Sequence, residues 1–311
     1  MPALEVIRPG MLALVQDLGR FGVAQQGLSQ GGVLDLHAAC WANHLVGNTS
    51  SSAVIEVTIG QTQLYARSDL LVAITGADMS PQLDGDVCPL WQSFEVKKGQ
   101  VLTFGYARTG IRAYIAIRGG IATPEVLGSR STVPRNQLGG LVDGQALEAG
   151  DIIPLGEADP TQWQGFVGRM TSFRFIPDYS QPIMLRVIES YQSHLFSFDD
   201  KERFYHSVYT VRQESDRMGC RLSGSAISVE VPEMVSEGIA LGAIQFPPDG
   251  QPIILLNDRQ TLGGYPKIGC VAKVDLSLLA QARPGTEIRF EKGDLPLLQK
   301  EWLAFGRFFG V

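Results

Sequence analysis

The sequence predicts a mainly β fold, and three observations support this prediction. Most segments between glycines are short and rich in Val, Ile, Leu, Phe and Tyr, a composition typical of strands. The 35 glycines and 17 prolines of the chain place turns between these segments at frequent intervals. Several motifs of the first half also recur, in the same order, in the second half. Short strands with frequent turns favour barrels or sandwiches over a fold in which strands and helices alternate.

The recurring motifs indicate an internal duplication. The matches are, in chain order, Val6-Ile7 with Val187-Ile188, Arg20-Phe21-Gly22 with Arg217-Met218-Gly219, Glu56 with Glu237, Ile59-Gly60 and Gln63 with Leu241-Gly242 and Gln245, the segment from Leu71 to Ile74 with that from Ile253 to Leu256, and Gly99 with Gly285. A repeat of this length indicates two copies of one domain rather than a solenoid. We expect one domain in residues 1–165, with a helical insertion near 34–46, and the other in residues 180–311. Chance similarity among glycine-rich β sequences is the alternative.

Four helices are expected between and after the strands: Leu34 to Val46, Asp199 to Ser207 (capped by Ser197 or Asp199), Leu276 to Ala282, and Leu295 to Phe309. The last helix presents an apolar face formed by Trp302, Phe305, Phe308 and Phe309. We expect this face to pack against the protein's own core. A docking surface is the alternative role.

Composition and charge exclude several classes of function. Hydrophobic residues make up 44% of the chain and charged residues 19%, as in an ordinary globular protein. The net charge of −6 comes without the basic stripe that nucleic-acid binding requires. No apolar run approaches the roughly 18 residues of a membrane span, and the N-terminus has no signal-peptide pattern. We therefore expect a cytoplasmic protein that binds neither nucleic acid nor membrane.

The cysteines and histidines do not predict a metal site. Cys40, Cys88, Cys220 and Cys270 lie far apart without a CxxC pair, so we expect reduced core residues. His37 and His44 can share a helix face, but no HExxH pattern or neighbouring carboxylate accompanies them. The phosphate-binding pattern GxxxxGK[ST] is also missing from the sequence.

The stretch from Ile253 to Lys267 is the most informative part of the chain. Four apolar residues, Ile-Ile-Leu-Leu, predict a buried strand, which ends in the polar run from Asn257 to Thr261. Gly263 and Gly264 then permit a tight turn. A strand that ends in polar groups beside a glycine loop is a common way to build a small-molecule site. An ordinary polar turn is the alternative.

Several long motifs together resemble one family. They are Val15 to Gly22, Gly31 to Asp35, Arg112 to Ile121, Leu127 to Thr132, Ser215 to Gly219, Ser236 to Gly238 and Asn257 to Lys267. These segments resemble the C subunit of bacterial 5-oxoprolinase, also called allophanate hydrolase subunit 2 or the biotin-dependent carboxyltransferase family. Its relatives include the carboxyltransferase part of urea amidolyase and the antagonist of a sporulation-kinase inhibitor. The resemblance runs from about Leu4 to Phe290.

The resemblance implies a pair of cyclophilin-like β-barrels. It also implies a stable complex with a second protein, the B subunit of 5-oxoprolinase, which is of the allophanate hydrolase subunit 1 type. In the oxoprolinase system the A subunit, a protein of the lactam-utilisation type, joins them. The three subunits together use ATP, with Mg²⁺, to open the lactam ring of 5-oxo-L-proline to glutamate.

The chemistry of such a reaction assigns roles to individual residues. A lactam amide is a poor electrophile, and a phosphate placed on its oxygen requires cations and N–H groups around it. For proton transfer and catalysis we expect Asp258, Gln260, Glu237 and Asp216, of which Asp258 and Asp216 are also candidates, with Asp17, for metal binding. For substrate or phosphate binding we expect Arg217, Arg20, Asn257, Thr261, Gly263, Gly264, Tyr265, Lys267 and Asp17.

Structural roles for these residues are the alternative. Arg20 with Asp17, and Arg217 with Asp216 or Glu214, can be ion pairs that fix a β-turn. Glu237 and Glu56 recur at matching places of the two copies, which favours a role in the fold at least as strongly as a role in catalysis.

Two other functions compete with the oxoprolinase interpretation. The first is carboxyl transfer from carboxybiotin to an amide or urea-like nitrogen, for which a separate carrier must supply biotin because the chain has no Met-Lys-Met sequence. The second is a non-catalytic regulator that binds a kinase-inhibitor protein. The polar loop from Asn257 to Lys267 weighs against the regulator, because interaction surfaces favour aromatic and arginine anchors.

Overall fold

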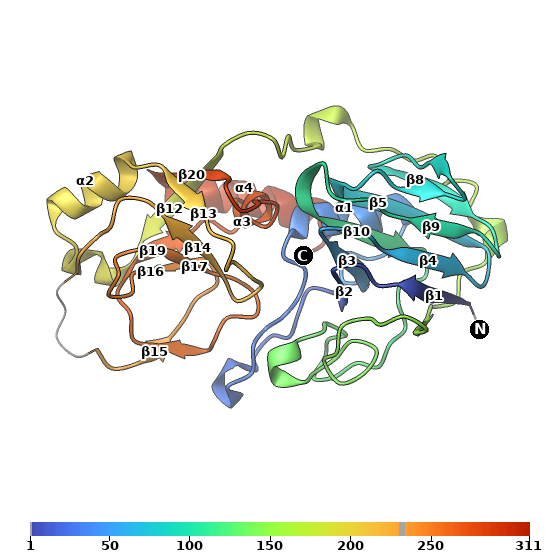
Figure 1. The fold of residues 1–311 in the computed structure, drawn as a ribbon, viewed down its shortest axis with the longest axis horizontal. Helices are drawn as coiled ribbons and strands as arrows, with labels where there is room; N and C mark the ends of the chain where they lie inside the picture. Colours follow the sequence, from blue (N-terminus) through green and yellow to red (C-terminus); the bar gives the residue numbers. More distant parts are fainter. Residues whose placement is uncertain (1, 230–233) are drawn as a thin grey trace. The chain divides into compact units, whose positions relative to one another are not determined.

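The computed structural model describes residues 2–229 and 234–311, and the predicted mainly β fold is confirmed (Figure 1). The strands are β1 Ala3–Arg8, β2 Leu12–Gln16, β3 Val54–Thr58, β4 Gln63–Ala66, β5 Leu70–Asp78, β6 Gln82–Leu83, β7 Asp86–Val87, β8 Gln92–Val96, β9 Val101–Thr103, β10 Thr109–Ile117, β11 Ile152–Pro154, β12 Ile183–Glu189, β13 Tyr209–Val211, β14 Gly219–Ser223, β15 Glu237–Gly238, β16 Ala243–Gln245, β17 Ile253–Leu255, β18 Leu262–Gly263, β19 Lys267–Val271 and β20 Glu287–Lys292. The α-helices are α1 Leu36–Val46, α2 Phe198–His206, α3 Leu276–Leu279 and α4 Leu295–Phe309.

The chain forms two compact units. The first contains Met1–Phe21, Gly31–Ser180 and Phe309–Val311, and the second contains Gly22–Gln30 and Gln181–Phe308. The segment Gly22–Gln30 joins the second unit although it belongs to the first half of the sequence. Ser29 explains this, because its buried hydroxyl donates to the carbonyl oxygens of Asp258 and Arg259 at 3.2 and 2.9 Å. The domain limits expected from the sequence, 1–165 and 180–311, stay a prediction.

The first unit is built from two antiparallel sheets and one long helix. Its sheets have the strand orders β11-β1-β4-β9-β6-β7 and β2-β3-β10-β5-β8. Helix α1 packs on β5 and β10. It begins at Leu36 because the side chain of Asp35 accepts from the N–H of Ala38, and it ends where Gly47 adopts a left-handed conformation.

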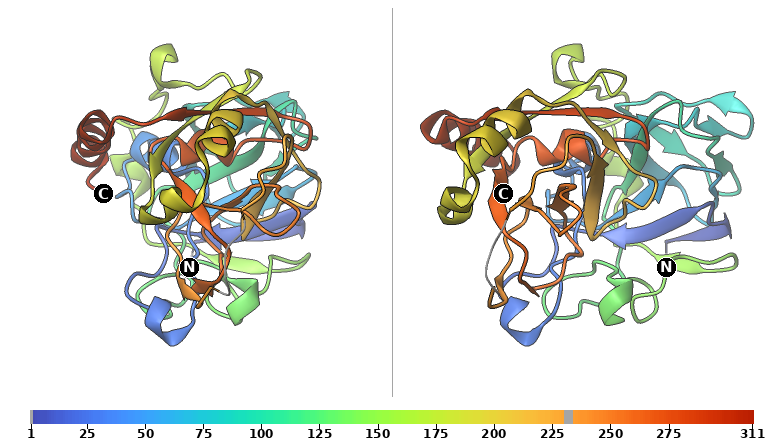
Figure 2. Two further views of the ribbon diagram at one scale, coloured as in Figure 1. Left: turned by 90° about the vertical axis from the view of Figure 1, so that its left-hand side faces the viewer. Right: turned by 60° about the vertical axis from the view of Figure 1, so that its left-hand side comes forward.

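The second unit contains a closed barrel in the order β12-β19-β16-β17-β14-β13-β20. The barrel closes through parallel pairing of β12 with β20, in which Ile183 is the partner of Ile288. A buried aromatic cluster joins the barrel to α2, and in this cluster Phe204 stacks on Phe290 of β20 at 4.4 Å between ring centroids. Helix α2, capped by the Ser197 side chain, lies against β20 (Figure 2). Strands β15 and β18 form a separate two-stranded sheet, and β15 lies apart from the barrel strands in Figure 1.

Backbone conformations at matching glycines support the duplication hypothesis, but the strand pairings of the two units differ. Gly60 and its match Gly242 both have positive φ, 110° and 80°, as do Gly99 and Gly285, 94° and 90°. The first strands of the two units pair differently, however. Strand β1 pairs with β4 and β11, whereas β12 pairs with β19 and β20.

Helix α4 matches the predicted range, but the expected packing of its apolar face is wrong for part of that face. Leu298 is the one buried residue of this fully described helix, and Phe308 remains 55% exposed. Phe309, which belongs to the first unit, packs on Trp41 with 5.3 Å between ring centroids. An ion pair of Glu301 with Arg186 at 2.9 Å and the contact of Lys273 over the ring of Trp302 at 3.8 Å also hold the helix. Polar contacts of this kind hold the helix without a continuous apolar surface beneath it.

The cysteines agree with the prediction from sequence. All four are free, and three of them, Cys40, Cys88 and Cys220, are buried. Among the described residues, no helix is long and apolar enough to cross a membrane.

Candidate functional site

Four neighbouring strands of the barrel place one row of side chains on the same face. In the strand pairings, Arg221 of β14 is the partner of Ile253 of β17, Ile253 is the partner of Gln245 of β16, and Gln245 is the partner of Lys267 of β19. Register partners in an antiparallel sheet point to the same side. The row therefore presents a guanidinium, an apolar side chain, an amide and an ammonium group in that order. The adjacent row on the opposite face, Cys220, Ile254 and Ile244, is buried and apolar.

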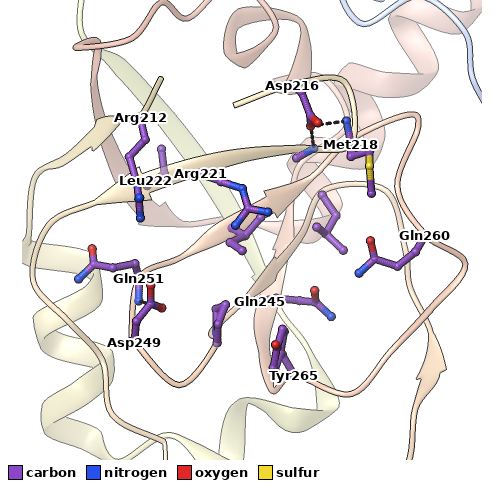
Figure 3. A pocket seen from close by; sticks show the side chains of 14 residues that line it. Arg212, Asp216, Met218, Arg221, Leu222, Gln245, Asp249, Gln251, Gln260 and Tyr265 are labelled. Atoms are coloured by element: carbon purple, nitrogen blue, oxygen red, sulfur yellow. Dashed lines mark hydrogen bonds between the residues drawn. The ribbon is translucent and has the colours of Figure 1, made fainter. Parts of the chain in front are cut away.

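A cavity of about 250 Å³ lies over this face (Figure 3). Its wall is formed by side chains of three strands and of the loops between them: Arg212, Asp216, Met218, Gly219, Arg221, Leu222, Gln245, Pro247, Asp249, Gln251, Ile253, Leu255, Gln260 and Tyr265. Polar groups dominate this wall, while Ile253 and Leu255 provide an apolar patch within it.

Gln245 is the most unusual residue of the cavity wall. Its side chain is only 1% exposed, yet its Nε2 has no hydrogen-bond partner within the described part of the chain. Figure 3 shows its amide pointing toward the space that Gln260 and Tyr265 border. Gly263 of β18 lies close by, since a Cβ at this position would approach Nε2 of Gln245 to 3.0 Å. A buried amide without a partner is destabilising, and such groups mark sites where a ligand or water completes the hydrogen bonding.

Some of the charged side chains around the cavity already bind other groups of the protein, and one does not. Arg212 is paired with Glu214 through contacts of 3.3 and 3.2 Å. Asp216 accepts from the N–H groups of Met218 and Gly219 at 2.8 and 3.1 Å, and Asp249 accepts from the N–H of Gln251 at 3.1 Å. The guanidinium of Arg221 makes no hydrogen bond or ion pair with the residues that the structure describes. Arg221 is therefore the cation of this wall that is available for a ligand.

A second polar cluster surrounds Glu237, at the place where β15 meets β18. Nζ of Lys267 lies 2.6 Å from Oε1 of Glu237, the amide of Gln192 donates to the same oxygen at 2.6 Å, and the hydroxyl of Tyr191 donates to Oε2. The bonds from Lys267 and then Tyr191 lower the pKa of the Glu237 carboxyl below its ordinary value of 4.5. The side chain of Glu237 is 33% exposed and that of Lys267 only 7%. Two residues predicted for different roles thus form one ion pair.

Arg217 and Asp258, both expected at the active site, are engaged with each other. Nε and Nη2 of Arg217 donate to the two carboxylate oxygens of Asp258 at 2.9 and 3.1 Å. Both side chains are buried, and Asn257 beside them is 9% exposed. For a structural role of Arg217, the sequence suggested an ion pair with Asp216 or Glu214. In the structure, Arg217 forms an ion pair with Asp258. This geometry supports a structural role for the pair.

Arg20 and Asp17, in the first unit, hold the segment from Val126 to Ser131. Arg20 donates to the carbonyl oxygens of Val126 and Ser131 at 3.0 and 2.6 Å. Asp17 accepts from the hydroxyls of Ser129 and Ser131, each at 2.6 Å, and from two backbone N–H groups. These contacts fix the loop through its buried residues Ser129 and Ser131, while Leu127 at its tip is exposed.

The matching glutamates Glu56 and Glu237 have different surroundings. Glu56 is completely buried and accepts hydrogen bonds from the hydroxyl of Tyr114 at 2.8 Å and the N–H of Leu34 at 3.1 Å. Glu237 is partly exposed and pairs with a lysine. The structural role suggested for both residues therefore fits Glu56 better than Glu237.

The structure thus brings some predicted site residues together and separates others. Asp216, Gln260 and Tyr265 line the cavity, Glu237 and Lys267 form the neighbouring pair, and Gly263 lies between the two places. Gly264 and Thr261 are not among the residues that line the cavity. A Cβ on Gly264 would lie 3.3 Å from the carbonyl oxygen of Met234, and the carbonyl oxygen of Thr261 accepts from the N–H of Ile239 at 3.1 Å.

Sequence reasoning did not assign Arg221 and Gln245 to the site. The sequence signal for Arg221 was its position as a charged residue between the apolar Cys220 and Leu222. Gln245 appeared only as a repeat match. Within the described residues, no three His, Cys, Asp or Glu side chains gather as metal ligands do.

The fold and the cavity define a β-barrel protein with a small polar site on a barrel wall. Comparison with known proteins makes the class specific, because the family model for the carboxyltransferase domain, subdomain A and B, matches residues 26–292. The chain belongs to this family.

Individual relatives agree with this assignment. The C subunit of 5-oxoprolinase from Escherichia coli (strain K12) is 37% identical over 290 residues, which are 92% of this chain and 90% of that protein. The urea amidolyase of Saccharomyces cerevisiae is 30% identical over 303 residues, 93% of this chain but 16% of that protein.

Solved structures show the same fold. The crystal structure of the K. lactis urea amidolyase superimposes with a TM-score of 0.89 at 29% identity, over 98% of this chain and 20% of that one. The crystal structure of TTHA0988 superimposes with a TM-score of 0.81 at 36% identity over 94% of this chain. This chain spans 56% of the length of TTHA0988, little more than half of it.

Proposed function

We propose that this chain is a subunit of an ATP-dependent 5-oxoprolinase that converts 5-oxo-L-proline, ATP and water to L-glutamate, ADP and phosphate. The observation that carries the proposal is the similarity to the C subunit of 5-oxoprolinase over almost the full length of that protein. The urea amidolyase relative has lower identity and matches over a small part of its own length. Under this proposal the chain acts with two partners, the B subunit and the A subunit of such an enzyme.

The polar cavity supports a role in binding the small-molecule substrate. 5-Oxo-L-proline carries a carboxylate and a lactam amide, and the cavity wall offers a guanidinium from Arg221 and amides from Gln245 and Gln260. Pockets for drug-sized ligands have volumes of roughly 300–1,000 Å³, so a cavity of about 250 Å³ suits a smaller molecule.

The contacts of the two expected phosphate-binding arginines favour an ATP site on another subunit. Arg20 and Arg217, expected as phosphate-binding groups, donate to carbonyl oxygens and to Asp258 respectively. The described residues contain no group of three or more His, Cys, Asp or Glu side chains placed as metal ligands are. We therefore assign no nucleotide step to this chain and propose that ATP binds on another subunit.

Glu237 is the candidate for proton transfer in this chain. Its lowered pKa keeps it ionised at neutral pH, so it can accept a proton, but the hydrogen bond from Lys267 also makes it a weak base. In this arrangement Glu237 and Lys267 together orient a water or a substrate N–H beside the cavity.

Carboxyl transfer is the second candidate function, because the matching family is described as a carboxyltransferase domain. In that case a biotinylated carrier brings carboxybiotin, and the amide groups of the cavity orient the nitrogen that accepts the carboxyl group. A regulator that binds a kinase-inhibitor protein is the third possibility.

Reconstitution distinguishes these functions. The purified chain is combined with its candidate B and A partners, and glutamate release from 5-oxo-L-proline is measured with and without ATP. We expect ATP-dependent glutamate only from the complete set. Absence of glutamate from the complete set rejects the proposal. Bicarbonate-dependent turnover that requires a biotinylated carrier supports carboxyl transfer, and assembly without any turnover supports the regulator.

A further inference from the structure

We propose that the cavity on the barrel wall binds a small carboxylate that also carries a carbonyl group, and that Arg221 and Gln245 recognise these two groups. Arg221 takes the carboxylate, and the amide of Gln245 donates to the carbonyl oxygen. This inference rests on the proposed function, under which the ligand is 5-oxo-L-proline.

The first support is the unsatisfied amide of Gln245. The side chain is 1% exposed, and its Nε2 has no partner among the described residues although it lies in the cavity wall. Gly263 lets strand β18 approach this amide closely, since a Cβ there would lie 3.0 Å from Nε2 and 2.6 Å from Cδ1 of Ile239. The amide is therefore held in a narrow space. A ligand oxygen that reaches it gains a hydrogen bond that the protein itself does not supply.

The second support is the distribution of charge on the cavity wall. Arg212 is bound to Glu214, while the carboxylates of Asp216 and Asp249 accept backbone N–H groups. Arg221 makes no hydrogen bond or close ion pair within the residues described by the structure, and its charge reaches Glu214 only at longer range. A guanidinium binds a carboxylate through two parallel N–H groups, which fixes the orientation of the ligand as well as its charge.

The third support is the spacing of the two groups. Arg221, Ile253 and Gln245 are successive register partners on three adjacent strands. Neighbouring strands lie about 5 Å apart, so the Cα atoms of Arg221 and Gln245 are separated by about 10 Å. Both side chains are long enough to reach inward from these positions to a five-membered ring. The ring methylene groups then rest on Ile253, which lies between them.

The size of the cavity limits the ligand. Its volume of about 250 Å³ accommodates a ring with one carboxylate, and it is below the range of roughly 300–1,000 Å³ that drug-sized ligands occupy. The site is thus suited to the lactam rather than to a nucleotide.

Calorimetric titration of the complex reconstituted with the B and A partners tests the proposal. Three ligands are compared: 5-oxo-L-proline, L-proline, which lacks the ring carbonyl, and 2-pyrrolidinone, which lacks the carboxylate. The variants are Arg221→Met, Arg221→Lys and Gln245→Leu. Arg289→Met on β20 and Gln299→Leu on α4 replace exposed residues of the same two types outside the cavity and serve as matched controls.

We expect Arg221→Met to weaken binding of 5-oxo-L-proline by about tenfold to a hundredfold, and Arg221→Lys to weaken it less. The same Arg221→Met change leaves the affinity for 2-pyrrolidinone unaltered. Gln245→Leu weakens binding of 5-oxo-L-proline about tenfold and leaves that of L-proline unaltered. Both controls bind like the unmodified complex. Affinities for 5-oxo-L-proline that stay within about twofold in both cavity variants overturn the proposal.

A parallel measurement of glutamate release separates this inference from the proposed function. If the complex hydrolyses 5-oxo-L-proline and the two cavity variants keep its KM, the function stands and the binding site is rejected. If the complex binds 5-oxo-L-proline through Arg221 and Gln245 but releases no glutamate with ATP, the site stands and the oxoprolinase function is rejected. If both hold, KM rises in the variants while kcat is largely retained.

Discussion

Arg217 and Asp258 form a two-point ion pair in the second unit, with contacts of 2.9 and 3.1 Å between groups that are almost completely buried. The pair joins the turn before β14 to the turn after β17. The backbone N–H of Asp258 also donates to the carbonyl oxygen of Arg217 at 3.0 Å. These two residues are predicted for catalysis and phosphate binding, which stays a prediction, and their mutual contacts indicate a role in stability.

Replacement of Asp258 tests this connection. Asp258→Ala removes the carboxylate that makes two contacts with the buried guanidinium of Arg217, and we expect a loss of about 3–5 kcal/mol in the free energy of unfolding. The double variant Arg217→Met with Asp258→Leu removes both charges and should recover much of that loss. Urea denaturation of the single and double variants measures both values. An Asp258→Ala protein of unchanged stability that has lost all activity would contradict the structural role.

The Glu237–Lys267 pair predicts a pH dependence of stability. The pKa of Glu237 is lowered in the folded state, chiefly by the hydrogen bond from Lys267. The carboxylate therefore stabilises the fold above its ordinary pKa of 4.5, and this contribution is lost as the pH falls below that value toward the folded-state pKa. We expect the unfolding free energies of the unmodified protein and Glu237→Gln to differ above pH 4.5 and to converge as the pH is lowered from 4.5 toward the folded-state pKa.

Denaturation of both proteins at a series of pH values measures this difference. Asp249→Asn, which removes an exposed carboxylate without a cationic partner among the described contacts, is the control for loss of a surface charge. A gap between the Glu237→Gln variant and the unmodified protein that stays constant across the range would refute the lowered pKa.

Two buried glutamines are expected to respond oppositely to the same substitution. Gln245→Leu removes an amide whose Nε2 has no partner in the described chain, so stability should stay the same or increase. Gln16→Leu removes an amide that donates to the carbonyl oxygen of Thr132 at 2.9 Å and accepts from the N–H of Gly32 at 3.1 Å. That change removes two buried hydrogen bonds to the backbone and should cost about 1–3 kcal/mol. Thermal and urea unfolding compare the two, and a destabilised Gln245→Leu protein would show that the amide has a structural partner.

Two glycines of similar backbone conformation differ in the space around them. Gly60 and Gly99 have φ values of 110° and 94°, but a Cβ on Gly60 would lie 1.9 Å from the carbonyl oxygen of Gly105, whereas a Cβ on Gly99 meets nothing within 4 Å. Gly99→Ala should therefore cost only the backbone strain, about 1–2 kcal/mol. Gly60→Ala should cost clearly more, because the backbone must move. Equal losses in unfolding free energy for the two variants would argue against the close approach of Gly60 and Gly105.

Local signals predicted the existence of the four helices, and the site only in part. Helix α1 begins at Leu36 rather than Leu34, and α3 ends at Leu279 rather than Ala282. Asp35 and Gly47 delimit α1, and the periodic pattern of α4 gives its full range, because caps and periodicity act within a few residues. The burial of Asp258 depends on Arg217, 41 positions earlier in the chain. The role of Gln245 depends on the register of four strands, which no local pattern encodes. Gln260 and Tyr265 were predicted correctly as neighbours of a cavity because they lie on the loop that follows the apolar strand and contains Gly263 and Gly264.

The most direct test is a crystal structure of this chain assembled with its B and A partners in the presence of 5-oxo-L-proline. We expect the ligand in the cavity on the barrel wall, with its carboxylate on the guanidinium of Arg221 and its ring oxygen within hydrogen-bond distance of Gln245 Nε2. A ligand bound to one of the partners, with this cavity filled by ordered water alone, would contradict the account.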